Sequence, residues 1–185
     1  MTFNPRKSAQ VVAFFVTKSR GASINVLKAI KLVYLADRRS IQKFGFPILD
    51  EPRVSMPHGP VNSTTYSYVN GEIESEGWSE FLDARAHHQI GISRAVTNDD
   101  LDELSDADLQ CLEETWREFG HMDQWQLVDY THDRRNVPEW EDPKGSSRPI
   151  PLERILTMVG IENGDENAAV VEGHRQIDSV FKSLS

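Results

Sequence analysis

The residue in this chain that is best placed for chemistry is a histidine in a loop between two prolines. The segment Met56-Pro57-His58-Gly59-Pro60-Val61 sets His58 between prolines of fixed φ and beside a glycine that tolerates φ > 0. Such a loop holds an imidazole in one place, as a general base or a metal ligand requires. Asp37, on the helix predicted before the loop, could pair with His58 as acid and base. An enzyme built on this pair is one hypothesis for the chain.

The predicted helix carries polar residues on its apolar stripe. Tyr34, Asp37 and Arg38 recur at helical spacing, and Lys31 lies one turn before Tyr34. A carboxylate buried on such a stripe needs a partner, and Arg38, Lys31 and His58 are the candidates. The alternative without chemistry, which we favour, is that Asp37 accepts hydrogen bonds that fix the loop.

Other arrangements that serve catalysis or metal binding are missing. No G-x-S-x-G turn occurs, and the glycines form neither a P-loop nor a dinucleotide fingerprint. Acidic neighbours would raise the pKa of Cys111, the single cysteine, and no second histidine lies at ligand spacing from His58. We therefore predict no catalytic residue, no metal site and no cofactor.

The charges are unevenly spread along the chain, whose net charge is −9. Residues 1–53 hold ten Lys/Arg and three Asp/Glu, whereas residues 72–118 hold three Arg and fourteen Asp/Glu. This polarity favours a charged partner, two faces that attract one another, or two solvated faces. Nucleic-acid binding would use the early cations, but an isoelectric point near 5.1 opposes it. The early cations are Arg6, Lys7, Lys18, Arg20, Lys28, Lys31, Arg38, Arg39 and Lys43.

The length and composition fit one ordinary domain in the cytoplasm. The 185 residues, 38% hydrophobic, suffice for a core without staples. No apolar run approaches the roughly 18 residues of a membrane span, and we expect neither a membrane segment nor a signal peptide. One cysteine excludes an internal disulfide.

Capping residues, prolines and glycines divide the chain into predicted elements. Helices are expected from Pro5 to Ser19 behind an Asn4 cap, from Asn25 to Phe44, from Pro60 to Tyr68, from Ser105 to Phe119, after Asp123, after Pro151, and from Val170 to Leu184. Alternation of Ile90, Ile92, Arg94 and Val96 predicts a strand, which we pair with the extended segment around Val54 and Met56. The fold class is mainly α: a compact bundle of about six to seven helices with a small antiparallel β-ribbon.

Five motifs in order resemble those of the Panacea domain, the domain of SocA-like antitoxins that also occurs in phage-associated proteins. The resemblance covers about residues 8–160 of a single domain over 1–185, with 161–185 as a C-terminal helix. The motifs are Lys31-Leu32-Val33-Tyr34-Leu35-Ala36-Asp37, Phe44-Gly45-Phe46-Pro47-Ile48, His58-Gly59-Pro60-Val61, Leu127-Val128-Asp129-Tyr130-Thr131-His132 and Pro138-Glu139-Trp140.

The resemblance implies a helical domain without catalytic activity that neutralises a toxin. It would block the toxin by direct binding or deliver it to an ATP-dependent protease as an adaptor. Some relatives carry an additional N-terminal DNA-binding segment, which we expect to be missing here. A small enzyme using His58 and Asp37, and a DNA-binding regulator, stay as the alternatives.

Two surfaces are candidates for the toxin contact. The acidic segment could face a cationic toxin through Glu72, Glu74, Glu76 and Glu80. The other candidate is the aromatic set Tyr66, Tyr68 and Trp78. The motif residues are either scaffold or contacts, and we favour scaffold, with His58 tying the second helix to the short helix that follows. They are Lys31, Tyr34, Asp37, His58, Gly59, Pro60, Thr131, His132 and Trp140, to which Tyr66 is added.

Overall fold

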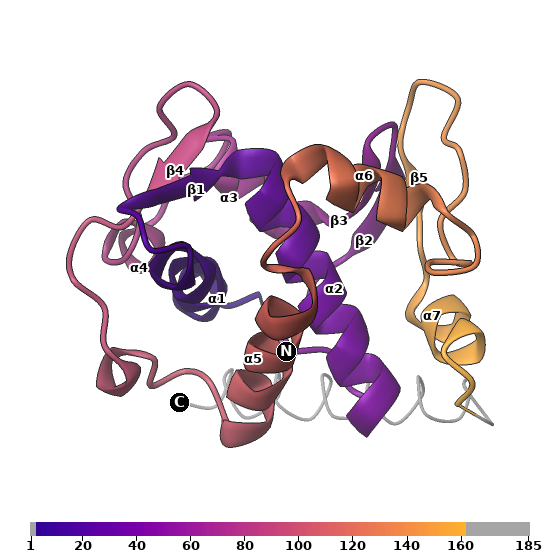
Figure 1. Cartoon of the computed structure of the whole chain (residues 1–185), viewed down its shortest axis with the longest axis horizontal. Coiled ribbons are helices and arrows are strands. Elements are labelled where there is room, and N and C mark those ends of the chain that lie inside the picture. The colour runs from indigo at the N-terminus through magenta and orange to yellow at the C-terminus, as the bar shows by residue number, and fades with distance from the viewer. Residues whose placement is uncertain (1–2, 162–185) are drawn as a thin grey trace, which may run out of the picture.

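The computed structural model describes residues 3–161, which form seven α-helices and two small antiparallel sheets at the periphery of the fold (Figure 1). The predicted fold class, mainly α with a minor β component, is confirmed. The helix predicted from Val170 to Leu184 lies outside the described residues. The elements are α1 (Pro5–Lys18), β1 (Ser23–Asn25), α2 (Val26–Phe44), β2 (Arg53–Met56), β3 (Gly59–Asn62), α3 (Ser63–Val69), α4 (Glu76–Ser79), β4 (Gln89–Gly91), the 3-10 turn η1 (Asn98–Asp100), α5 (Asp106–Phe119), α6 (Gln124–His132), β5 (Arg148–Pro149) and α7 (Leu152–Met158).

Helix α2 is the centre of the fold and packs against α1, α5, α6 and β3 (Figure 1). It begins at Val26 because the Asn25 side chain accepts a hydrogen bond from the Lys28 N–H, and it ends at Gly45, whose φ of 77° is left-handed. The residues from Ala29 to Asp37 are all buried. Polar side chains in this stretch must therefore find partners inside the protein.

The predicted helix starts at the other capping residues are confirmed. Asn4 accepts from the Lys7 N–H ahead of α1, and Ser105 with Asp108 forms a capping box ahead of α5. Asp123 accepts from the Trp125 and Gln126 N–H groups and fixes the first turn of α6. Each of these capping signals involves residues within the first turn of its helix, so it can be recognised in the sequence.

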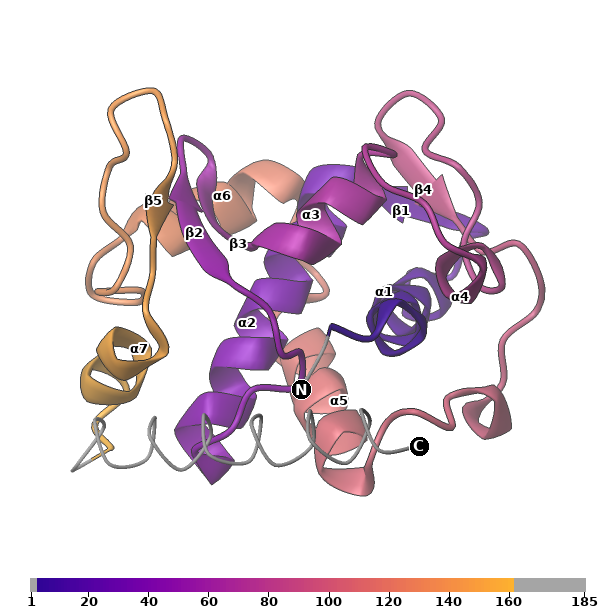
Figure 2. The ribbon, with the colours of Figure 1, turned by 180° about the vertical axis from the view of Figure 1, so that it is seen from behind.

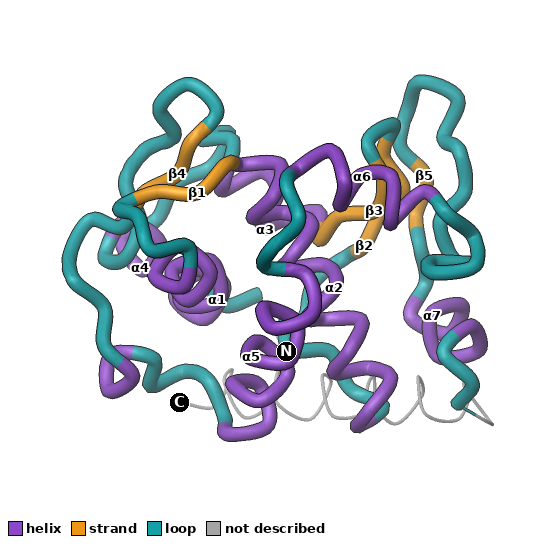
Figure 3. The backbone as a smooth tube through the Cα atoms, viewed as in Figure 1, coloured by secondary structure: helices purple, strands orange, loops and turns teal. Residues whose placement is uncertain are grey.

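The predicted pairing of the β-ribbon is wrong. Ile90 on β4 pairs with Ile24 on β1, and Val54 on β2 pairs with Val61 on β3. A two-residue turn, Pro57-His58, joins β2 to β3, and this local hairpin forms with less loss of chain entropy than a distant pairing. Figure 3 shows the two sheets at separate places in the fold, the second with strand order β3-β2-β5.

The helix predicted from Pro60 starts later, at Ser63, because Gly59–Asn62 is strand β3. Pro60 fits there because β3 is an edge strand. None of the helices in the described residues is long and apolar enough to cross a membrane.

Candidate functional site

The polar residues in the middle of α2 are buried or half-buried, and each ties the helix to another segment. Lys31, Tyr34 and Asp37 are at most 1% exposed, and Arg38 is half-buried. Figure 2 shows the segments that they reach, namely the hairpin of β2 and β3 and the chain around α6. These ties decide whether the motif residues are free to act.

Asp37 pairs with Arg53 and not with any of the three expected partners, Arg38, Lys31 and His58. Its Oδ2 accepts from Arg53 Nε at 2.6 Å and from Asn62 Nδ2 at 3.2 Å, and its Oδ1 accepts from the Leu49 N–H at 2.9 Å. The carboxylate is 1% exposed and Arg53 is 4% exposed. The pair therefore fixes strand β2 and the segment before it to α2.

A second buried carboxylate, Glu51, extends this network toward α1. It accepts from the Thr65 N–H at 2.7 Å and from Thr65 Oγ1 at 2.5 Å, and Asn62 Nδ2 lies 3.4 Å from its Oε1. The Ser8 hydroxyl lies 2.7 Å from Thr65 Oγ1. Burial raises the pKa of Glu51, which the hydrogen bonds from Thr65 oppose.

Glu139, another buried carboxylate, binds α2 from the segment that follows α6. Its Oε1 accepts from Tyr34 Oη at 2.8 Å and from Arg38 Nε at 2.6 Å. Burial and the neighbouring Glu139 raise the pKa of Tyr34, so the phenol stays a hydrogen-bond donor. This contact positions the loop that carries Trp140.

Gly59 and Pro60 lie where the hairpin approaches α2 and α6 most closely. Lys31 Nζ donates to the Pro60 carbonyl at 2.8 Å. Gly59 has a φ of 96°, and a Cβ at this position would lie 2.6 Å from Thr131 Oγ1 and 3.0 Å from Lys31 Nζ. The glycine is thus required by both its backbone conformation and its surroundings.

His132 and Trp140 hold the turn of the same hairpin through its carbonyl groups. His132 Nε2 donates to Pro57 O at 3.0 Å, and Trp140 Nε1 donates to Met56 O at 3.2 Å. The two rings also pack edge to face, with centroids 4.3 Å apart. Burial lowers the pKa of His132.

His58 itself makes none of these ties, contrary to our expectation. Its side chain is exposed at the turn, and its ring meets the Trp125 ring edge-on at 5.9 Å. Asp37 is buried and already bonded to Arg53, so the two residues do not form an acid–base pair. The backbone of the loop, not its histidine, connects the hairpin to α2.

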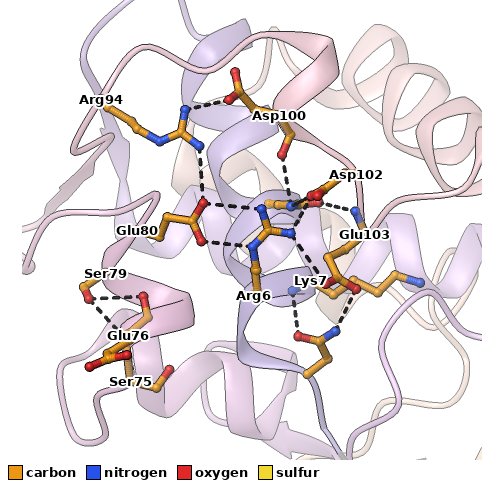
Figure 4. A network of polar contacts seen from close by, with 12 residues as sticks. Arg6, Lys7, Ser75, Glu76, Ser79, Glu80, Arg94, Asp100, Asp102 and Glu103 are labelled. Carbon is orange, nitrogen blue, oxygen red and sulfur yellow. Dashed lines mark hydrogen bonds and ion pairs between the residues drawn. The ribbon is translucent and has the colours of Figure 1, made fainter.

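The acidic segment and the basic N-terminal region attract one another within the molecule. Figure 4 shows Arg6 of α1 between Glu80, at 2.9 Å from its Nε, and Asp102, at 2.5 Å from its Nη1. Arg94 bonds Glu80 as well. Within residues 3–161, six of the nine early cations form ion pairs, which leaves few of them for phosphate groups; the six are Arg6, Lys7, Lys18, Arg38, Arg39 and Lys43.

The remaining acidic candidates are exposed, whereas the aromatic ones are partly used in packing. Glu72 accepts from Ser67 Oγ, and Glu74 and Glu76 face solvent. Tyr68 stacks between Phe3 and Trp78, and Trp78 is 6% exposed, which removes Trp78 from the set of available anchors.

Sequence reasoning missed Arg53, Glu51 and Asn62, and it quoted Glu139 without a role. The sequence feature that came nearest to indicating them was the position of Arg53 and Glu51 in a short segment predicted to be extended. No group of histidine, cysteine or acidic residues that could hold a metal ion occurs in residues 3–161. Cys111 is buried and burial raises its pKa, so it is a poor nucleophile.

Comparison with known families gives one match. The sequence model for the SocA-like antitoxins, Panacea domain, matches residues 30–141, which is more than half of the chain. This range runs from the buried polar stretch of α2 to the Pro138-Glu139-Trp140 segment. No curated protein and no solved structure matches the chain significantly.

Proposed function

The chain belongs to the family of SocA-like antitoxins with a Panacea domain, and we propose that it neutralises a cognate protein toxin by binding it directly. The proposal contains no catalytic step. Delivery of the bound toxin to an ATP-dependent protease is a second mode that membership of this family allows. We place this activity in the cytoplasm, where a free cysteine such as Cys111 stays reduced.

One observation carries the proposal: the motif residues other than His58 are engaged in contacts that hold separate segments of the fold together. Asp37, Tyr34, His132 and Trp140 each bond a partner from another segment. Groups used in this way are not available to substrates, and a scaffold of this kind holds a surface in a fixed shape. Function then belongs to what the scaffold presents, as in a protein that acts by binding.

The acidic segment presents one surface to which a cationic toxin could bind. Glu72, Glu74 and Glu76 are exposed there, whereas Glu80 is partly neutralised by Arg6 and Arg94. Complementary charge would speed the encounter more than it would add affinity. Tyr66, half-buried on α3, is the aromatic candidate that remains a possible anchor.

The test uses the reading frame that neighbours this gene as the candidate toxin. Expression of that frame alone should arrest growth, and co-expression of this chain should restore it, with the two proteins purifying together. Toxin levels separate the two modes: blocking leaves them unchanged, whereas an adaptor lowers them only in cells that contain the protease. Absence of both rescue and complex would overturn the proposal.

A further inference from the structure

A cavity of about 540 Å³ opens where five parts of the fold meet: the first turns of α2, the turn between β2 and β3, α3, the loop before β4 and the start of α6. Figure 2 shows these elements around the upper half of α2. We call the cavity the basic groove, and the lining residues that matter here are Lys31, His58, Tyr66, Arg85, His88 and Trp125.

The charge of the groove is opposite to that of the chain. The protein carries 29 aspartate and glutamate residues, yet none of those within residues 3–161 lines the groove. Arg85 is held in the wall, because its guanidinium donates to the His87 carbonyl at 2.8 Å and also to Asn70 Oδ1. The N-terminus of α2, which carries a partial positive charge, opens into the same space.

Lys31 places a cation without a carboxylate partner at the groove. Its side chain is 0% exposed, and within residues 3–161 its hydrogen-bond acceptor is the Pro60 carbonyl. Arg38 and Arg53, which are also buried or half-buried on the polar network, each have a carboxylate. Because burial lowers the pKa of Lys31 to about 7, its amine is only partly charged near neutral pH, and an anion on this side of the molecule favours the charged form.

The rim of the groove resembles a protein-binding surface more than an enclosed small-molecule site. Trp125 is 55% exposed, the largest exposed fraction among the exposed large hydrophobic side chains of the described residues. The Asp123 capping box fixes the turn of α6 that carries it, and the exposed His58 ring lies against it. Tryptophan and arginine, which both line this groove, are residue types enriched in binding hot spots.

We propose that the basic groove receives an apolar segment of the toxin that carries one or more carboxylates. The apolar side chains of that segment pack on Trp125 and Tyr66, and its carboxylates face Arg85 and His88. This inference rests on the proposed antitoxin function, and it assigns the contact to a surface separate from Glu72, Glu74 and Glu76.

The test measures the affinity of the wild-type chain and its variants for a purified, inactivated product of the neighbouring reading frame. Trp125→Ala and Arg85→Glu should each weaken binding by about tenfold or more. Two matched controls lie outside the groove: Met158→Ala, an exposed apolar side chain, and Arg117→Glu, an exposed cation. Both controls should bind like the wild type, and all four variants should keep the melting temperature.

Salt and hydrogen exchange add two independent readouts. Raising the salt concentration should weaken the wild-type complex more than the Arg85→Glu complex. Binding should protect the amides of residues 56–62 and 124–128. Normal binding by both groove variants, or protection confined to residues 72–80, would overturn the groove proposal and leave the antitoxin function standing. Failure of the wild-type chain to bind would overturn both.

Discussion

Asp37 Oδ2 accepts a hydrogen bond from Arg53 Nε at 2.6 Å inside a region from which water is excluded. The pair joins the middle of α2 to the first residue of strand β2. Because both groups are buried, removing either partner would leave an unpaired charge that destabilises the fold. The intact pair nevertheless adds less to stability than its geometry suggests. The main effect of the pair is therefore to specify how the hairpin sits on α2.

The first prediction concerns this pair. Asp37→Ala should lower the free energy of unfolding by about 3–5 kcal/mol, because it leaves Arg53 buried without a counter-charge. The double variant Asp37→Leu/Arg53→Met should recover most of that loss. Urea denaturation measures both. Arg135→Ala, which removes a cation whose side chain is 88% exposed, should cause no measurable change. A double variant as unstable as Asp37→Ala would contradict this account.

The second prediction concerns the glycine at the hairpin turn. Gly59→Ala places a Cβ 2.6 Å from Thr131 Oγ1 at a φ of 96°, so strain and overlap add to about 2–5 kcal/mol of destabilisation. Gly145 has a φ of 86° with no atom within 4 Å of a Cβ, so Gly145→Ala should cost about 1–2 kcal/mol. Thermal unfolding compares the two.

Removal of the neighbouring hydroxyl separates strain from overlap at Gly59. In a Thr131→Ala background, Gly59→Ala should cost less than it does in the wild-type chain, because the nearest atom is gone. Equal costs in both backgrounds would mean that overlap with Thr131 is unimportant.

The third prediction compares two histidines at the same hairpin. His58 is exposed, so His58→Ala should leave the melting temperature unchanged. His132 donates to Pro57 O and packs on Trp140, so His132→Ala should lower the unfolding free energy by about 1–2 kcal/mol. Calorimetry on both variants tests this. A drop in melting temperature for His58→Ala alone would restore the idea of a structural imidazole.

The capping residues and the apolar stripes predicted most of the helices because those signals act over three or four residues. Asn4, Ser105 and Asp123 each accept from an N–H within their own first turn. The partners of the buried carboxylates could not be predicted in this way. Arg53 is 16 positions from Asp37, and Arg38 is 101 positions from Glu139. The sequence does not distinguish an arginine on a solvent-exposed strand from one inside a buried hydrogen-bond network.

The sequence predicted which motif residues make up the candidate site but not how these residues contact one another. The sequence could show that Tyr34, Asp37 and Arg38 share a face of one helix. It could not show that Asp37 faces the hairpin while Tyr34 and Arg38 face Glu139, since the approach of those segments depends on packing across the whole fold. The basic groove has no sequence signal at all, because its residues come from five separate segments.

The fourth prediction concerns the pH dependence of stability through Lys31. Burial lowers the pKa of Lys31 to about 7, below its ordinary value of 10.5. The unfolded chain therefore binds the proton more tightly, so Lys31 destabilises the fold fully below pH 7, and this penalty is relieved as the pH rises from 7 to 10.5. Relative to Lys31→Met, the wild-type chain should gain about 1.4 kcal/mol per pH unit across that window.

Denaturation of both proteins at intervals from pH 6 to pH 10 gives the difference in unfolding free energy and cancels the other titrating groups. Lys31→Met should be the more stable protein at pH 6, and its advantage should shrink with rising pH. Parallel pH profiles would show that the ammonium is not destabilised by burial.

The last prediction concerns Arg6, which holds the acidic segment against α1. Its guanidinium bonds Glu80 and Asp102 and lies 5.3 Å from the centre of the Phe81 ring, so it connects α4 to the chain after η1 (Figure 4). Arg6→Gln removes this connection, and limited proteolysis within residues 83–104 should become faster. Salt should speed the same cleavage in the wild-type chain and have a smaller effect on the variant, because these pairs are partly exposed. Arg117→Gln, which removes an exposed cation without an ion pair among the described residues, serves as the control and should be cleaved like the wild type. Cleavage of Arg6→Gln at the wild-type rate would mean that apolar packing alone holds the segment.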